Sequence, residues 1–367
     1  MKLTIEQGQL LRSLQMVERA VNERSALPVL ANVLLETTER ELVLTATDLD
    51  VGVRYRLPLG EPAEQGAVTI PARRLTTIVR ELPPEPILVE AKSNHTATLT
   101  CGASRFRIPG LPPEDFPIFP AVAQAKAVTI SQPALKSLVG QTAFAMSMEE
   151  TRFILNGALV KAGNGAVTLA ATDGRRLAVA SAAAAASAGE PFSVVVPAKT
   201  MRELGRLLNS DEDAPVNIAL LKDNQLFFEF GAVTMITRLI EGQFPPYESV
   251  IPAPAPLSVT CSRALLTSAV RRASLMTTAT SQAVVFELDN GKLVVVKESA
   301  DVGSAREELE ARYTGGPMSI AFNPEFWLDV LKVLEGDDVT IELTGPDKPA
   351  VVRLPDFVYV VIPMKLA

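Results

Sequence analysis

The chain has 367 residues, of which 47% are hydrophobic and 21% are charged, and its formal net charge is −7. This length and composition indicate a globular protein of two to three domains and exclude a disordered chain. One histidine and two cysteines leave no material for a histidine-based triad, a zinc site or a disulfide framework. No apolar run is long enough to span a membrane and no signal-peptide pattern is present, so we expect a cytoplasmic protein.

A segment that predicts a short strand followed by a helix occurs three times, at 68–75, 195–201 and 320–326. Each helix carries a proline in its first turn. Pro71, Pro197 and Asn323 occupy the same place in the three copies and are equally spaced. An interval this long indicates three related domains, because solenoid repeats are only about 20 to 50 residues long. We predict domains at 1–122, 123–253 and 254–367.

Each predicted domain combines strands with two amphipathic helices. Apolar periodicity predicts helices at 6–24, 71–81, 131–146, 197–208, 262–276 and 323–335. In the first repeat, β-rich segments predict strands at 2–5, 29–36, 41–48, 52–59, 87–91, 96–101 and 104–108. The second repeat restarts with a strand at 127–130, and its hairpin is predicted at 152–160 and 167–173. Proline-rich segments close the first two repeats at 109–117 and 242–247.

Positive charge concentrates on the predicted helices, whereas the strands and loops are acidic. Opposite their apolar stripes, two helices carry basic residues, namely Arg73 and Arg80 on one and Lys199, Arg202 and Arg206 on the other. One surface could therefore attract a polyanion although the net charge is negative. Solvated charge is the alternative interpretation of each such face.

The remaining chemically active residues point to structural roles. His95 lies in a polar stretch that predicts a hairpin tip, and Cys101 and Cys261 are expected to be buried small side chains. Carboxylates such as Asp48 and Asp173 would be the only material for an enzyme. Because they recur at period-related positions, we interpret them as turn residues. We therefore expect no enzyme, no cofactor and no metal.

The whole chain resembles the bacterial DNA polymerase III beta subunit, the sliding clamp, in its three β-rich repeats and in three motifs. The motifs are Pro71-Ala72-Arg73, Ala171-Thr172-Asp173-Gly174-Arg175-Arg176-Leu177 and Tyr359-Val360-Val361-Ile362-Pro363-Met364-Lys365-Leu366. The resemblance implies an α+β fold of three repeated clamp domains, each of antiparallel sheets with two helices. It further implies a head-to-tail homodimer, closed into a six-domain ring whose helices line a hole for duplex DNA.

Such a ring implies a processivity factor in DNA replication. Encirclement holds the protein on DNA, so weak, sequence-independent attraction to phosphates is enough. The partners implied are double-stranded DNA, the DNA polymerase III alpha subunit, the clamp loader and other proteins with a clamp-binding motif, but no membrane. A partner bound to the ring is held near its template at high effective concentration.

By resemblance, Arg24 and Arg73 match positions that contact DNA in the family. Glu149, Phe153 and Ile154 match a DNA-facing segment that is usually aromatic or polar and neutral there. Strand packing is the alternative interpretation of Phe153 and Ile154. Together with the basic helix face of the second repeat, the predicted DNA-binding residues are Arg24, Arg73, Glu149, Phe153, Ile154, Lys199 and Arg202.

The resemblance also implies a hydrophobic pocket for short peptides of polymerase and repair proteins. Apolar anchors with a flexible methionine suit such an adaptable groove. Its predicted residues are Leu155, Thr172, Gly174, Arg175, Arg176, Leu177, Pro245, Val250, Asn323, Val360, Val361, Ile362, Pro363, Met364 and Lys365. A plain turn is the alternative interpretation of 172–174.

The dimer interface is predicted to pair the first domain of one subunit with the third domain of the other. By resemblance, it uses Phe106 and Ile108 on one side and Leu275 and Met276 on the other, and ordinary core packing is the alternative. Mutual pairing would remove the exposed strand edges at both ends of an open three-domain arc. The competing function is a cytosolic three-repeat interaction scaffold that never encircles DNA.

Overall fold

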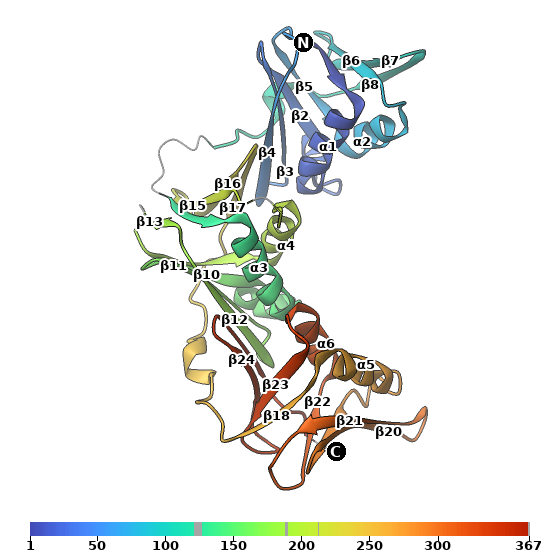
Figure 1. Cartoon of the computed structure of the whole chain (residues 1–367). Coiled ribbons are helices and arrows are strands. Elements are labelled where there is room, and N and C mark those ends of the chain that lie inside the picture. Colours follow the sequence, from blue (N-terminus) through green and yellow to red (C-terminus); the bar gives the residue numbers. More distant parts are fainter. Residues whose placement is uncertain (121–126, 188–189, 212, 366–367) are drawn as a thin grey trace. The chain divides into compact units, whose positions relative to one another are not determined.

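The computed structural model describes residues 1–120, 127–187, 190–211 and 213–365 (Figure 1). The predicted boundary between residues 122 and 123, and Leu366 of the terminal motif, lie outside the described residues. The chain forms two compact units. The first comprises Met1–Pro133, Ala184–Glu190 and Arg206–Leu239, and the second Ala134–Ala183, Pro191–Gly205 and Ile240–Ala367. The middle third of the sequence thus contributes to both units.

The first unit contains two antiparallel sheets. The smaller has the order β1 (Lys2–Glu6), β6 (Pro86–Ala91), β7 (Thr96–Cys101), β8 (Ser104–Pro109). The larger has the order β13 (Ala186–Ser187), β9 (Val128–Ser131), β15 (Pro215–Leu221), β16 (Gln225–Phe230), β17 (Val233–Arg238), β4 (Val51–Pro58), β3 (Glu41–Thr47), β2 (Asn32–Thr37), β5 (Gly66–Pro71). Pairing of β17 with β4 joins the second sequence repeat to the first.

The second unit contains one sheet that runs through two repeats. Its order is β14 (Phe192–Pro197), β10 (Gly157–Gly163), β11 (Ala166–Thr172), β12 (Arg176–Ala183), β25 (Phe357–Val361), β24 (Ala350–Leu354), β23 (Asp338–Leu343), β18 (Leu257–Ser262), β21 (Gly303–Arg312), β20 (Lys292–Ser299), β19 (Val284–Asp289), β22 (Met318–Phe322). Pairing of β12 with β25 joins the third repeat to the second.

Helices pack on these sheets through apolar faces. They are α1 (Gln7–Val17), α2 (Ala72–Glu81), α3 (Gln132–Thr142), α4 (Ala198–Leu207), α5 (Arg263–Ser274) and α6 (Pro324–Val333). In Figure 1, α1 lies beside α2, and α5 lies beside α6. Leu75 and Val79 of α2 are buried on its apolar face. Trp327 of α6 is also buried and packs against Phe286 and Phe322. The one-face spacing of these residues explains why the sequence predicted the helices.

Four predicted boundaries are wrong. The helices predicted at 6–24 and 131–146 end at Val17 and Thr142 and continue only as 3-10 turns, Glu18–Ala20 and Ala143–Ala145. Residues predicted to begin strands at 29 and 152 instead form 3-10 turns, Pro28–Ala31 and Glu150–Leu155. Both turns carry short apolar runs that fill a core before the strand begins, and such runs do not distinguish strand from turn.

Other local predictions are confirmed. His95 has a positive φ of 59° in the turn between β6 and β7, and both cysteines are buried. Burial raises the pKa of the Cys261 thiol to about 12.

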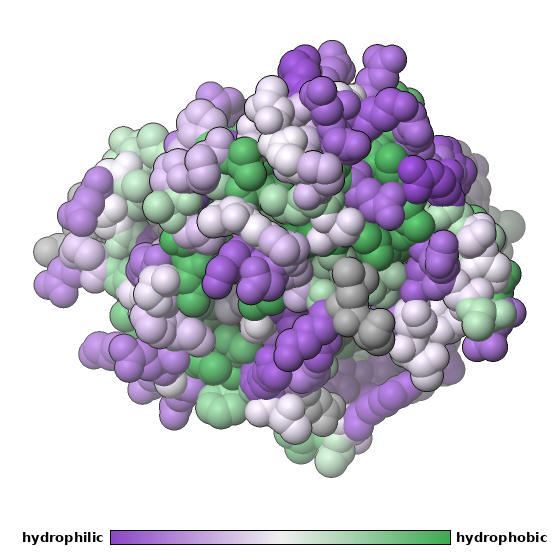
Figure 2. Space-filling view, turned by 90° about the horizontal axis from the view of Figure 1, so that it is seen from below, coloured by the Kyte–Doolittle hydropathy of each residue, from purple (hydrophilic) through white to green (hydrophobic). Residues whose placement is uncertain are grey.

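The surface of the C-terminal end of the chain mixes polar and apolar side chains. Figure 2 shows that hydrophobic groups there occur in small clusters separated by hydrophilic ones. Within the described residues, no helix is long and apolar enough to cross a membrane.

Candidate functional site

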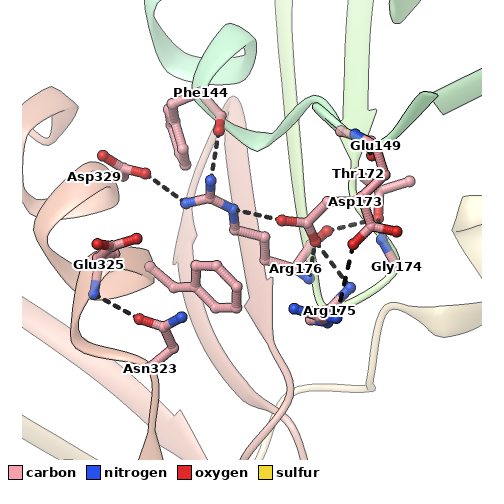
Figure 3. Close-up of polar contacts among 12 residues, drawn as sticks. Phe144, Glu149, Thr172, Asp173, Gly174, Arg175, Arg176, Asn323, Glu325 and Asp329 are labelled. Carbon is pink, nitrogen blue, oxygen red and sulfur yellow. Dashed lines mark hydrogen bonds and ion pairs between the residues drawn. The ribbon is translucent and has the colours of Figure 1, made fainter. Parts of the chain in front are cut away.

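The turn between β11 and β12 is held by its own side chains (Figure 3). The Thr172 hydroxyl donates to the Arg176 carbonyl at 2.6 Å and accepts from the Gly174 N–H at 3.0 Å. The Asp173 carboxylate accepts from the N–H groups of Arg175 and Arg176 at 2.9 and 3.0 Å. Gly174 has φ +86°, a conformation that other residues adopt only with strain. Residues 172–174 therefore form a tight turn that is capped by its own side chains.

Arg176 connects this turn to helix α6 (Figure 3). Its guanidinium donates to Asp173 at 3.1 Å, to Asp329 at 2.6 Å and to the Phe144 carbonyl at 2.7 Å. Its central carbon lies 4.4 Å from the centroid of the Phe326 ring. Burial alone would lower the pKa of Arg176, but the hydrogen bond to Asp329 and the nearby carboxylates outweigh it and raise the pKa. The Arg176 side chain is only 10% exposed, so its guanidinium forms hydrogen bonds mainly with protein groups and little with water.

An apolar cluster lies behind the turn. Three of the predicted pocket residues, Leu155, Leu177 and Val360, are buried together in it, and Leu177 pairs with Val360 across β12 and β25. Phe244 and Tyr247, from the proline-rich closing segment, complete the cluster.

A cavity of about 390 Å³ adjoins the cluster. Pro245 belongs to its lining, which consists of Leu159, Lys161, Ser193, Val195 and the segment 242–248. Val250 stands exposed at the end of the following 3-10 turn, Tyr247–Val250. Of the predicted pocket residues, this lining contains Pro245, whereas Met364 and Lys365 line a separate hollow of about 540 Å³ together with residues such as Ser281 and Lys297.

The last described residues are anchored to the second repeat and to their own, third repeat. The Ile362 N–H donates to the Arg175 carbonyl at 3.0 Å, and the Met364 N–H donates to the Ala321 carbonyl at 2.8 Å. The side chains of Ile362 and Met364 remain exposed, as does Lys365, whereas Pro363 is half-buried. Val361 is fully buried, so it supports the pocket region from within the core. Asn323 caps α6 by accepting from the Glu325 N–H at 2.9 Å.

Sequence reasoning missed a polar group at this cavity. The Lys161 ammonium on β10 is bonded to the Glu248 carboxylate and lies 4.8 Å from the centroid of the Tyr247 ring. This hydrogen bond raises the pKa of Lys161 and lowers the pKa of Glu248, while burial raises the pKa of Tyr247. The two partners are far apart in sequence and belong to different elements, so no local pattern signals the pair.

In the first unit, Arg24 and Arg73 are exposed. Arg73 forms an ion pair with Glu23 at 2.9 Å. A hollow of about 490 Å³ beside them is lined by Glu18, Arg19, Val21, Arg73, Thr76, Thr77 and Arg80. The buried Thr76 hydroxyl has no hydrogen-bond partner among the described residues.

In the second unit, Glu149 is paired with Arg152 at 3.4 Å and with Arg175 at 3.7 Å, so its charge is balanced locally. Phe153 is 61% exposed on a 3-10 turn, which contradicts strand packing for this residue. Ile154 is half-buried against the pocket cluster. Lys199 and Arg202 are exposed on α4.

The residues predicted for the dimer interface differ in exposure. Phe106 is exposed on β8, whereas Ile108 on the same strand is buried within its own unit. Leu275 is 70% exposed after α5, and Met276 is half-buried. Within the described residues, β8 pairs only with β7, and β21 pairs with β18 only at its last two residues. Both strands thus present free edges.

The three family models of the DNA polymerase III beta subunit match consecutive parts of the chain. The N-terminal domain matches residues 1–120, the central domain 129–246 and the C-terminal domain 248–365. The chain belongs to the DNA polymerase III beta subunit family, the beta sliding clamps. This confirms the predicted family, its three repeated clamp domains and the role of a processivity clamp in DNA replication.

Relatives match this family member over its whole length. The beta sliding clamp of Pseudomonas aeruginosa is 34% identical over 369 residues, which cover 100% of both chains. The beta sliding clamp of Chlamydia muridarum is 32% identical and covers 100% of this chain and 99% of its own.

Solved clamps have the same fold. The sliding clamp of Pseudomonas aeruginosa bound to griselimycin superposes with a TM-score of 0.94 at 34% identity, and that of Bacillus subtilis with 0.93 at 28%, each covering 100% of both chains. In the described part of the chain, no three His, Cys, Asp or Glu side chains form a metal-binding group.

Proposed function

We propose that two copies of this chain close into a head-to-tail ring that encircles duplex DNA and holds polymerases on it. The observation that carries the proposal is the match of all three clamp-domain models along the whole chain. As in the sequence prediction, we assign the domains to 1–122, 123–253 and 254–367.

Opposite charges on two free strand edges support the ring. Strand β8 exposes Arg105 and Arg107, and β21 exposes Glu308 and Glu310. Pairing these edges between subunits would satisfy backbone groups and join a basic edge to an acidic one. The exposed side chains of Phe106 and Leu275 would then be covered.

Weak phosphate contacts would hold the DNA. Arg24, Arg73, Lys199 and Arg202 are exposed on long flexible side chains, which suits contacts that do not depend on base sequence. Glu149 would not repel DNA strongly, because two arginines balance it. Replacing Arg24 or Arg73 with alanine should weaken binding equally on all sequences and lower the slope of log K against log salt by about 1 each.

The hollow beside Leu177 would bind short peptides of partner proteins. Its apolar cluster, the exposed Ile362 and the Lys161–Glu248 pair at the rim would provide both anchors and polar contacts. The Pseudomonas aeruginosa clamp with bound griselimycin shares this fold. We therefore expect griselimycin to compete with partner peptides here.

The partners proposed are double-stranded DNA, the polymerase III alpha subunit, the clamp loader and other proteins with clamp-binding motifs. We infer that the chain is not an enzyme and acts in the cytoplasm. The carboxylates of Asp48 and Asp173 accept backbone hydrogen bonds in turns, a structural use that explains their recurrence.

Retention on DNA of different topology tests the ring. The chain, loaded on nicked circular DNA, should stay bound during gel filtration and be released when the circle is cut. A scaffold that never encircles DNA would show no dependence on topology.

Charge reversal tests the proposed edges. The double variant Arg105→Glu/Arg107→Glu should be monomeric in light scattering, and the added changes Glu308→Arg/Glu310→Arg should restore the dimer. The control Arg40→Glu/Lys222→Glu reverses two exposed charges in turns of the first unit and should stay dimeric. Dimerisation of the β8 variant alone would contradict this interface.

A further inference from the structure

Lys297 on β20 is a buried cation without a counter-charge. It is only 4% exposed, and it is the only buried residue with a charged side chain in the part of the chain that the structure describes. Its ammonium donates to the Ser281 hydroxyl at 2.6 Å, and no carboxylate of the described residues forms an ion pair with it. Burial consequently lowers the pKa of Lys297. An ammonium has three N–H donors, so two of them have no acceptor among these residues.

The strand pattern does not explain a lysine at this position. Side chains alternate between the two faces of a strand, so Lys297 shares its face with Leu293 and Val295, which are both buried. An apolar side chain would continue this face at no electrostatic cost. A buried ammonium without an anion destabilises a fold, and an anion bound beside it would offset that cost.

A hollow of about 540 Å³ adjoins the ammonium. Both Lys297 and its hydrogen-bond partner Ser281 belong to the lining. Ser281 lies in the segment that connects α5 to β19 and is exposed, so the hydroxyl that the ammonium contacts is open to solvent. The other neutral polar residues of the lining are Thr280, Gln282 and Ser319. Their hydroxyl and amide groups are donors that suit an oxygen anion.

The rest of the lining limits the kind of anion. One part of it is apolar and consists of Ala283, Val285, Val296 and Met364. Glu287 and Glu298 also line the hollow, but Arg306 lies 2.9 Å from the Glu287 carboxylate, and Lys365 brings an exposed positive charge. The charges of the rim therefore nearly cancel, and one buried ammonium is left to be balanced. A singly charged anion with a short aliphatic part fits these groups better than a dianion such as phosphate.

We propose that this hollow binds a carboxylate that carries a short aliphatic chain, held by the Lys297 ammonium and the Ser281 hydroxyl. The hydroxyl accepts from Lys297 and retains its own proton for the anion. The aliphatic chain would lie against Val285 and Met364. The site shares no lining residue with the hollow of about 390 Å³, and it rests neither on the ring nor on the peptide pocket. A free acid and an acidic side chain of a partner peptide present the same chemistry.

Thermal unfolding of the full chain in its native assembly measures binding. Hexanoate is the first probe, and the peptide acetyl-Ala-Glu-Ala-amide is the second. Each should raise Tm in a saturable way, because a ligand that binds only the folded state stabilises it. Hexanol, which lacks the charge, and chloride at equal ionic strength should not. The probe that acts at the lower concentration identifies the source of the carboxylate. No increase with either probe at tens of millimolar, or an equal increase with hexanol, overturns the proposal.

Substitution of the ammonium tests its role. Lys297→Met removes the charge at a similar length and should weaken binding of the carboxylate about tenfold or more, because a hydrogen bond to a charged group is lost. The control Lys348→Met removes an exposed lysine from a turn of the third repeat and should leave binding unchanged. Unchanged binding by Lys297→Met overturns the proposal. If that variant does not fold, Ser281→Ala removes the hydroxyl from an exposed position, and unchanged binding by it has the same consequence.

Hydrogen exchange locates the bound probe. Slower exchange of residues 277–283 in its presence supports the proposal. Slower exchange confined to 172–177 and 242–250 would place the probe at the open pocket beside Leu177 and would overturn it. Because the two segments are read separately, failure of this site is distinguished from failure of the peptide pocket.

Discussion

The two inter-repeat junctions share a backbone arrangement and differ in the side chains that fill it. Both join strands of successive repeats with the same register and the same side-chain-capped turn. At one, Leu177 fills the space beneath the closing segment and leaves a hollow beside it. At the other, Gly52 leaves room for the Phe119 ring, and a hollow of about 130 Å³ remains. The same strand arrangement is therefore filled by a leucine at one junction and by a ring of the proline-rich segment at the other.

The junctions also differ in what holds them together. The β12–β25 junction is tied by the buried Arg176 between Asp173 and Asp329, whereas the β4–β17 junction has Val51 at the corresponding position. A polar network thus stabilises the first junction. The second obtains apolar contacts from the Phe119 ring.

The largest effect is expected from removing that network. Arg176→Met should lower the free energy of unfolding of the second unit by about 2–4 kcal/mol, because Asp173 loses a charged partner in a buried setting. Urea unfolding followed by Trp327 fluorescence measures it, since the single tryptophan lies in α6. The exposed Arg175→Met is the control and should stay within about 0.5 kcal/mol. Substitutions at the surface typically change the free energy of unfolding by about 0.5 kcal/mol or less. A loss of less than about 1 kcal/mol for Arg176→Met would be close to that value and would contradict the network's role.

Removing the Phe119 ring from the β4–β17 junction should have the second-largest effect. Phe119→Ala is expected to destabilise the first unit by about 1–2 kcal/mol, less than for a fully buried phenylalanine because the ring is only half-buried. Native-state hydrogen exchange of β4 and β17 measures the change. Ile118→Ala, which removes an exposed side chain, is the matched control. Equal effects of the two would show that Phe119 is not packed in the junction.

Substitutions at the two corresponding turn positions should change the free energy of unfolding in opposite directions. Gly174 and Leu49 occupy corresponding turn positions with φ of 86° and 81°. Gly174→Ala should cost about 1–2 kcal/mol, because alanine is strained at this φ and its Cβ would lie 2.6 Å from Arg152 Nη1. Leu49→Gly should stabilise by up to about 1 kcal/mol, reduced by the backbone entropy of glycine. Calorimetric unfolding measures both. If both substitutions changed the free energy of unfolding in the same direction, the two turns would not be equivalent.

The smallest effect concerns the rim of the open pocket and depends on pH. Because the hydrogen bond from Lys161 lowers the pKa of Glu248, the pair stabilises the fold above the ordinary carboxyl pKa of about 4.3. This stabilisation is lost as the pH falls through the lowered pKa. Glu248→Gln should therefore cost less than about 1 kcal/mol at pH 7, since the pair is exposed, and the cost should vanish in acid. Urea unfolding at several pH values measures it, with the exposed Glu229→Gln as control. A cost independent of pH would contradict the ion pair as its cause.

Local patterns in the chain were enough to predict the repeats, the helices and the family. The spacing of Pro71, Pro197 and Asn323 and the apolar stripes around residues such as Leu75 are local patterns, and a helix or repeat is specified by local periodicity. The motif 171–177 directed attention to the turn that lies beside the pocket.

The side-chain contacts at each junction could be read only from the tertiary structure. The bonds from Arg176 to Asp329 and from Lys161 to Glu248, and the position of Phe119 over Gly52, join residues far apart in the chain. Short apolar runs at 29–31 and 153–155 became turns because their cores required filling there. Packing depends on the volume left by distant side chains, which no local pattern records.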